Sequence, residues 1–175
     1  MGKLERIDLI VIHCSATKET QNYTFEQLVK DHKLRGFRCA GYHYYIRRDG
    51  EKHIGRQLDE IGAHVGDLNH NWHSVGICYE GGLDSKGRPK DTRTDEQQAV
   101  IISTIFEVYA YIEKNLKQNL DKVRIVGHRD LSPDKDRDGV VEPHEWVKHC
   151  PCFDASEEYE DMLNMYKLLR KNAAI

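Results

Sequence analysis

The chain has 175 residues, of which 39% are hydrophobic and 31% charged, and its formal net charge is −3. This length and composition can bury one core, which excludes a collagen-like, mucin-like or wholly disordered chain. The near-neutral charge argues against a dedicated nucleic-acid binder, which would carry a basic stripe. No apolar run is long enough to predict a transmembrane helix.

The first half of the chain predicts a strand, a helix and a β-hairpin. Thr24 is followed three residues later by Gln27, the pattern of a capping box at a helix N-terminus. Asp49-Gly50 lies between two apolar runs, which is typical of the tight turn of a hairpin. The expected elements are a strand at 7–13, a helix from 24 to about 36, and hairpin strands at 42–47 and 51–56.

The second half predicts two more strands and two more helices. Thr94 or Asp95 would begin the longest helix, which would run to about Leu116. The expected elements are a loop with a short helix at 57–71, a strand at 74–79, a polar loop at 81–93, the long helix, a strand at 123–126, an irregular segment at 127–154 and a helix at 157–170. The last helix would turn three side chains inward, namely Met162, Met165 and Leu169.

This order of elements predicts an α/β fold, with a central mixed β-sheet flanked by helices in a single domain, 1–175. The five cysteines are an odd number, and the N-terminus lacks the pattern of a signal peptide. We therefore expect a chain made in the cytoplasm, with reduced thiols that are available as metal ligands.

Two histidines stand at the ends of predicted strands. His13 ends the first strand, and His128 follows the strand at 123–126. Polar side chains at strand ends in α/β sheets tend to line a crevice. Cys150 lies in the irregular segment, and two imidazoles with one thiolate are a ligand set that zinc accepts, with a fourth position left for water. Spacing alone leaves open that the three are unrelated packing or surface residues.

Several segments match the motifs of one enzyme family in the same order along the chain. They are Val11–Thr17, Gly41–Tyr44 with Arg48–Gly50, Gly62–Val65, Ser74–Cys78 with Gly81–Asp84, Gly127-His128 and Lys148–Asp154. In these segments the chain resembles the zinc-dependent N-acetylmuramoyl-L-alanine amidases. It is most similar to the phage-type lysozyme-amidases, which share a fold with peptidoglycan recognition proteins. The match covers residues 7–154, and collinear motifs are far more specific than any one of them.

The resemblance implies an enzyme that hydrolyses the amide bond between N-acetylmuramic acid and L-alanine in peptidoglycan. It implies one zinc ion held by His13, His128 and Cys150, and catalytic roles for Tyr42 and Lys148. Lys148 would place positive charge where the oxyanion develops, and Tyr42 would orient the attacking water or relay its proton. A non-catalytic peptidoglycan-binding module on the same fold is the alternative, which the presence of these residues disfavours.

Several other residues leave alternatives open. Cys78 stands where another branch of the superfamily carries a glutamate as acid/base, and Glu80 either takes that role or is structural. Cys152 competes with Cys150 for zinc, although the motif position favours Cys150. Two further residues, His64 and Asn71, match positions of the family's substrate groove. The alternative is that they order their loop.

The resemblance also implies a partner and a setting. The partner is peptidoglycan, and we expect a monomer that binds neither nucleic acid nor membrane. We expect a phage or prophage lysin that is made in the cytoplasm and acts on the cell wall after release. A toxin delivered by a secretion machine is the alternative.

An acidic pattern, independent of this resemblance, lies at 134–145. It reads Asp-x-Asp-x-Asp-Gly, then five residues, then Glu, which is a complete EF-hand calcium loop. The candidate Ca²⁺ ligands are the side chains of Asp134, Asp136, Asp138 and Glu145 and the backbone carbonyl of Val140. Pro133 argues against a normal entering helix, so a plain acidic insertion is the alternative.

Overall fold

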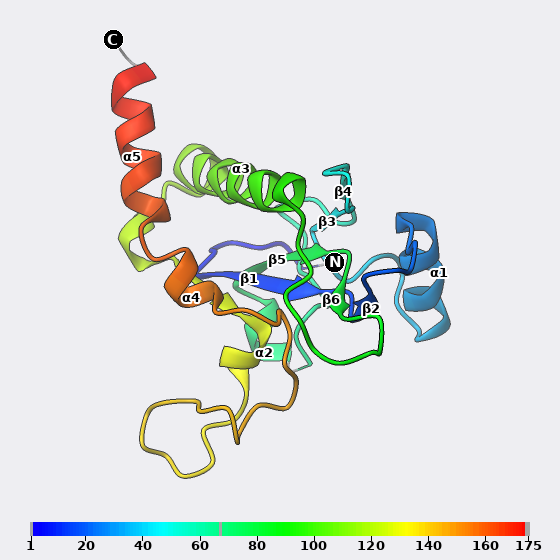
Figure 1. The fold of residues 1–175 in the computed structure, drawn as a ribbon. Coiled ribbons are helices and arrows are strands. Elements are labelled where there is room, and N and C mark those ends of the chain that lie inside the picture. The colour runs from blue at the N-terminus through cyan, green and yellow to red at the C-terminus, as the bar shows by residue number, and fades with distance from the viewer. Residues whose placement is uncertain (1, 67, 174–175) are drawn as a thin grey trace.

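A five-stranded mixed β-sheet forms the centre of the computed structural model, which describes residues 2–66 and 68–173 (Figure 1). Its strands are β1 (Leu9–Cys14), β3 (Tyr44–Ile46), β4 (Lys52–Ile54), β5 (Ser74–Tyr79) and β7 (Arg124–Gly127). They lie side by side in the order β4-β3-β5-β1-β7. Only β4 is antiparallel to its neighbour, which closes the expected hairpin. The predicted mixed sheet is confirmed.

The remaining elements are helices and one small sheet. The helices are α1 (Phe25–Leu34), α2 (Leu68–Asn71), α3 (Asp95–Tyr111) with a π-helical end at Ile112–Leu116, 3-10 turns at Leu120–Lys122 and His128–Leu131, α4 (Ala155–Glu158) and α5 (Met162–Ala173). A two-stranded parallel sheet pairs β2 (Thr17–Lys18) with β6 (Gly82–Leu83). Among the described residues, no helix has the length and apolar character needed to cross a bilayer.

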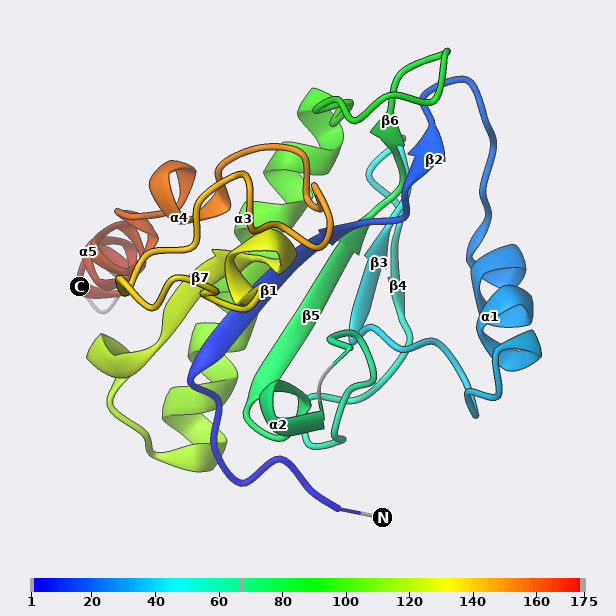
Figure 2. The ribbon, with the colours of Figure 1, turned by 90° about the horizontal axis from the view of Figure 1, so that it is seen from below.

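The two faces of the central sheet carry different side chains. Ile10 and Ile12 of β1, with Val75 and Ile77 of β5, belong to the core on the α3 side. Successive side chains of a strand point to opposite faces, so His13 lies on the other face. Figure 2 shows α3 behind the sheet and the segment that follows β7 in front of it. The pleat therefore separates a packing face from the face that holds the candidate site.

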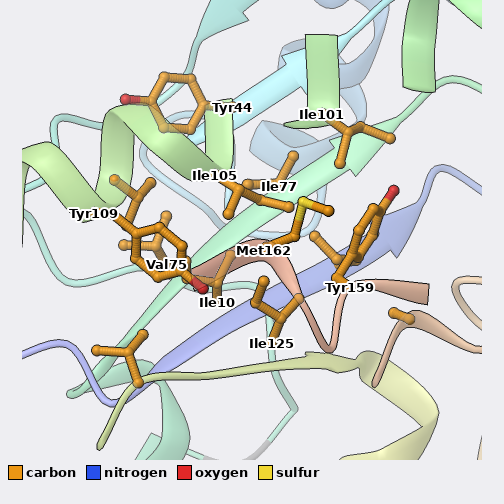
Figure 3. Packing of buried hydrophobic residues seen from close by; sticks show 14 of the residues in the cluster. Ile10, Tyr44, Val75, Ile77, Ile101, Ile105, Tyr109, Ile125, Tyr159 and Met162 are labelled. Atoms are coloured by element: carbon orange, nitrogen blue, oxygen red, sulfur yellow. The ribbon is translucent and has the colours of Figure 1, made fainter. Parts of the chain in front are cut away.

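The packing face explains why the long amphipathic helix forms where the sequence predicts it. Thr94 caps α3 in a reciprocal capping box with Gln97. Ile101 and Ile105 of this helix are fully buried against the sheet, and Met162 closes the same cluster from α5 (Figure 3). Burial of each such side chain contributes about 1.5–3 kcal/mol.

The N-terminal cap of α1 is simpler than predicted. The Thr24 hydroxyl accepts a hydrogen bond from the Gln27 backbone N–H. The Gln27 side chain instead donates to Asp31, 2.8 Å away on the next turn, so the reciprocal bond of a capping box is missing. The hairpin strands are also shorter than expected, at three residues each.

The prediction of one terminal helix with three inward side chains is wrong. Residues 155–173 form two helices, which are interrupted at 159–161. Met162 faces inward as predicted, but Met165 and Leu169 are 44% and 53% exposed. A helix that restarts at Met162 places residues four apart on one face, so Tyr166 takes the inward position.

Candidate active site and metal centre

Three metal-ligating side chains from distant parts of the sequence meet on the site face of the sheet. β1 and β7 are parallel neighbours, so His13 near the end of β1 lies beside His128, which directly follows β7. Cys150 reaches the same point from the irregular segment before α4. The Nδ1 atom of His13 lies 3.2 Å from Nδ1 of His128 and 3.8 Å from the sulfur of Cys150.

These separations fit a zinc ion. Tetrahedral zinc binds nitrogen at about 2.0–2.1 Å and sulfur at about 2.3 Å, so two nitrogen ligands should lie about 3.3 Å apart and a nitrogen and a sulfur about 3.6 Å apart. The His13–His128 and His13–Cys150 distances match these values within a few tenths of an ångström. The residues present therefore fit a zinc ion.

The protonation of the two imidazoles also suits a metal. Burial lowers the pKa of His13 well below its ordinary value, and nearby imidazoles and the Lys148 ammonium lower it further. Burial also lowers the pKa of His128 to about 4, again with a contribution from Lys148. Both rings are therefore neutral at pH 7, the form in which histidine binds metals.

Backbone donors fix Cys150 in this cluster. The Cys14 N–H donates to the Cys150 sulfur at 3.2 Å, and the Arg129 N–H donates to the Cys150 carbonyl at 2.7 Å. The Cys152 thiol lies instead 3.1 Å from the Gly82 carbonyl. Within the described parts of the chain, the structure therefore groups Cys150, and not Cys152, with the two histidines.

Tyr42 lies against the ligand cluster. Its ring centre is 5.1 Å from that of His13. Burial, together with the nearby thiols of Cys78 and Cys150, raises the pKa of Tyr42 well above its ordinary value. Its hydroxyl therefore stays protonated at neutral pH and can donate a hydrogen bond.

Lys148 is exposed and opens onto a cavity of about 220 Å³ beside His128. The other walls are mostly apolar and include Val65, Leu131, Pro133 and Val147. A substrate in this cavity would have both the imidazole and the ammonium group beside it.

The two residues that match the family's substrate groove are both buried. His64 and Asn71 are 7% and 2% exposed, and neither is among the residues that line the cavity. The Asn71 side-chain oxygen accepts hydrogen bonds from the backbone N–H groups of His64 and Val65, and its amide donates to the Val65 carbonyl. These bonds fit the alternative role of ordering the loop.

Glu80 occupies a structural position. It is 1% exposed, and one carboxylate oxygen accepts a hydrogen bond from the Arg47 guanidinium at 2.7 Å. The other oxygen accepts from the Tyr23 backbone N–H at 2.6 Å. These bonds connect the carboxylate to the segment that follows β3 and to the segment that precedes α1.

The acidic segment at 134–145 forms a loop that extends away from the sheet (Figure 1). Glu145 is fully buried at its base, where its carboxylate accepts from the backbone N–H groups of Lys135 and Glu142. Asp134, near the start of the loop, accepts from the N–H groups of Arg137 and Gly139. Backbone N–H groups of the loop therefore bind the carboxylates of the same loop.

Comparison with known proteins decides the family. Residues 3–145 match the N-acetylmuramoyl-L-alanine amidase family, Amidase_2. The chain belongs to this family. It is 33% identical to an endolysin of Klebsiella phage KP32 over 158 residues, which are 90% of this chain and 89% of the endolysin. It is also 42% identical to an uncharacterized protein of Haemophilus influenzae over 124 residues, which are 68% of this chain and 98% of that protein.

Solved structures agree with this assignment at the level of the fold. The endolysin amidase LysCS of Clostridium intestinale has a TM-score of 0.61 at 23% identity, over 94% of this amidase chain and 89% of LysCS. Bumblebee PGRP-SA has a TM-score of 0.65 at 18% identity, over 92% and 85% of the two chains. A chain from a complex of the peptidoglycan recognition proteins LCa and LCx with tracheal cytotoxin has a TM-score of 0.59 at 21% identity. The match covers 88% of this chain and 81% of that chain.

The amidase is therefore an enzyme of peptidoglycan degradation. Its reaction is hydrolysis of the amide bond that joins N-acetylmuramic acid to L-alanine.

The sequence does not single out two residues beside the ligand cluster, Ser74 and His43, whose side chains contact His64. The register that places Ser74 opposite Leu9 of β1 is set by tertiary pairing, and no local pattern signals it.

Proposed function

We propose that this amidase depends on zinc, with His13, His128 and Cys150 as the ligands of one ion. The observation that carries the proposal is the spacing of the three donor atoms, which lie within 4.8 Å of one another. The His13–His128 and His13–Cys150 separations are close to those a zinc tetrahedron needs. Zinc bound there supplies a Lewis acid that polarises the scissile carbonyl and lowers the pKa of water toward about 7.

Lys148 and Tyr42 would act on the charge and the proton of the reaction. The Lys148 ammonium stands beside the cavity next to His128, where a tetrahedral oxyanion would develop, and a cation there stabilises that charge. The protonated Tyr42 hydroxyl is a donor that would orient the attacking water or relay its proton.

The relatives suggest where the enzyme acts. Its phage relatives carry the name endolysin, and we infer that this chain likewise reaches the cell wall after release from the cell that makes it. The proposed ligands and catalytic residues all come from one chain, which supports a monomer as the active unit.

Digestion of purified peptidoglycan sacculi tests the zinc proposal. We expect soluble fragments with new L-alanine amino termini, loss of activity with a chelator, and recovery with Zn²⁺. Binding of sacculi without release of fragments would favour the non-catalytic module. New reducing ends would indicate glycan cleavage and would contradict the amide-bond reaction.

We also propose that the acidic loop at 134–145 binds one Ca²⁺. The side-chain oxygens of Asp134, Asp136 and Asp138 lie within 4.8 Å of one another, as hard-cation ligands must. Partial burial raises the pKa of Glu142, and the nearby carboxylates of Asp138 and Asp136 raise it further. This crowding of negative charge is what a bound Ca²⁺ would relieve.

The calcium ion would have a structural role. Gly139 has a φ of +94°, which permits the sharp turn between the proposed ligands. Glu145 and the Val140 carbonyl would complete the ligand set. The loop leads directly into Lys148 and Cys150, so an ion that orders it would steady the residues beside the zinc site.

A further inference from the structure

The nitrogen of His13 that faces away from the ligand cluster is the start of a buried hydrogen-bonded chain. Nε2 of His13 lies 3.0 Å from Nδ1 of His64. Nε2 of His64 lies 3.3 Å from the hydroxyl oxygen of Ser74, and that hydroxyl donates to the His70 carbonyl at 2.6 Å. The first three side chains are 0–7% exposed, so water does not compete for these contacts.

The carbonyl at the end of the chain fixes the direction of every bond in it. A carbonyl only accepts, so the Ser74 proton points to His70 and the Ser74 oxygen must accept from Nε2–H of His64. A neutral His64 with its proton on Nε2 has a lone pair on Nδ1, and that lone pair must accept from Nε2–H of His13. The lone pair of His13 is then on Nδ1, the atom that faces His128 and Cys150.

Backbone close to the His64 ring holds it in place. A Cβ atom on Gly76 would lie 2.5 Å from a ring atom, and one on Gly62 would lie 2.4 Å from the ring. Ser74 and Gly76 belong to β5 and pair with Leu9 and Val11 of β1, so they lie on the same face of the sheet as His13. With Asn71 bound to the His64 backbone, the imidazole occupies a fixed slot.

We propose that His64 and Ser74 are positioning residues that set the tautomer and the orientation of His13, and thereby the affinity of the site for its metal. This inference rests on the proposed role of His13 as a zinc ligand. Groups that bind the second nitrogen of a ligating histidine contribute typically about 10–100-fold to metal affinity.

His43 provides a matched control. It is fully buried and packs against His64 with ring centres 5.7 Å apart. Its Nδ1 accepts from the Gly76 N–H, and its Nε2–H donates to the Glu60 carbonyl. Both nitrogens of His43 thus bind backbone, and neither is bonded to His13 or His64. Replacement of His43 by leucine removes a buried imidazole that packs on His64 but takes no hydrogen bond from the chain that ends at His13.

The experiment compares the zinc affinity of His64→Leu, His43→Leu, Ser74→Ala and His64→Asn, measured on metal-free protein by competition with a chromophoric chelator. We expect His64→Leu to bind zinc roughly 10–100-fold more weakly than the parent, and Ser74→Ala to show a smaller loss. His43→Leu should lose thermal stability but keep the affinity. His64→Asn should keep most of the zinc affinity of the parent, because the asparagine side-chain oxygen can accept from Nε2–H of His13.

A second readout needs only the parent protein. Nitrogen chemical shifts from NMR of the metal-free protein should show both His13 and His64 with the proton on Nε2. A proton on Nδ1 of His13, or equal zinc affinities for His64→Leu and His43→Leu, would overturn the inference. Absence of zinc binding by the parent would instead remove the proposed zinc function, so the two failures are distinguishable. If His64→Leu does not fold, Ser74→Ala and the parent tautomers decide.

Discussion

The guanidinium of Arg129 stacks on the ring of Trp146, with 4.1 Å between the guanidinium carbon and the ring centre. Arg129 directly follows the proposed ligand His128, and its N–H donates to the carbonyl of Cys150. Trp146 directly follows Glu145, the last residue of the acidic loop. This one contact therefore links the proposed calcium site to two of the three proposed zinc ligands.

The first prediction follows from that link. Ca²⁺ should raise the thermal stability of the zinc-loaded protein, because an ion that binds only the folded state at 100 times its Kd adds about 2.7 kcal/mol, or about 5–10 °C in Tm for a chain of this size. Differential scanning calorimetry with and without millimolar Ca²⁺ measures the shift. Asp136→Ala and Glu145→Gln should abolish it. If the parent shows no shift and isothermal titration detects no Ca²⁺ binding, the loop is a plain acidic insertion.

The second prediction separates the two neighbouring cysteines. Cys150→Ser should lose bound zinc and activity, because the Cys150 sulfur is the one that lies 3.8 Å from Nδ1 of His13. Cys152→Ser should keep both, because the Cys152 thiol bonds to the Gly82 carbonyl. Metal content by mass spectrometry, with sacculus digestion beside it, checks both variants. The opposite pattern would move the ligand by two residues.

The third prediction concerns the groups proposed to act on the substrate. Lys148→Ala should lower kcat roughly 10²–10³-fold, the loss typical of removing one donor to a developing oxyanion. Zinc content should not change, because the Lys148 side chain is exposed and outside the ligand cluster. Lys148→Arg, which keeps the charge, is the matched control and should recover part of the rate. Full turnover by Lys148→Ala would exclude the residue from the mechanism.

The fourth prediction concerns the hydroxyl of Tyr42. Tyr42→Phe should lower kcat and leave zinc content and fold intact, because the ring that packs on His13 is retained and only the proton donor is lost. Steady-state kinetics on a defined muramyl peptide, with a thermal melt as the check on folding, measures both effects. A rise in KM at constant kcat would mean that Tyr42 binds the substrate and does not take part in catalysis.

The sequence predicts the central strands and places two proposed ligands at strand ends. β1 and β5 are buried along their whole length, and most of their residues are apolar. His13 and His128 each stand at the end of a predicted strand, where polar side chains tend to line a crevice. The parallel pairing of β1 with β7, which the sequence does not predict, brings them together. The position of Cys150 in the irregular segment came only from the resemblance.

What the sequence did not predict depends on tertiary placement. The break between α4 and α5 has no glycine or proline to mark it, so the two helices read as one. His64 is 51 residues from His13, and their contact depends on the fold of the loop at 57–71 against β5. No periodic pattern encodes that loop, so the sequence leaves open whether His64 faces a substrate or orders the loop.

The last prediction concerns the effect of acid on the metal-free protein. Burial lowers the pKa of His32, His43 and His128 to about 4, whereas a histidine in the unfolded chain titrates near pH 6.5. Between these values the unfolded state binds more protons than the folded state. The free energy of unfolding should therefore fall as the pH falls from about 6.5 to about 4. His43 alone would account for about 3 kcal/mol of this loss.

Urea unfolding in the presence of a chelator, at about pH 7 and about pH 4.5, measures this dependence. The parent should lose stability between the two conditions. His43→Leu starts from a lower stability but has one imidazole fewer to protonate, so its loss between the two conditions should be smaller. Equal losses in the parent and the variant would mean that the His43 ring takes up no proton on unfolding in this range. A parent whose stability does not change would contradict the burial-driven shifts of all three histidines.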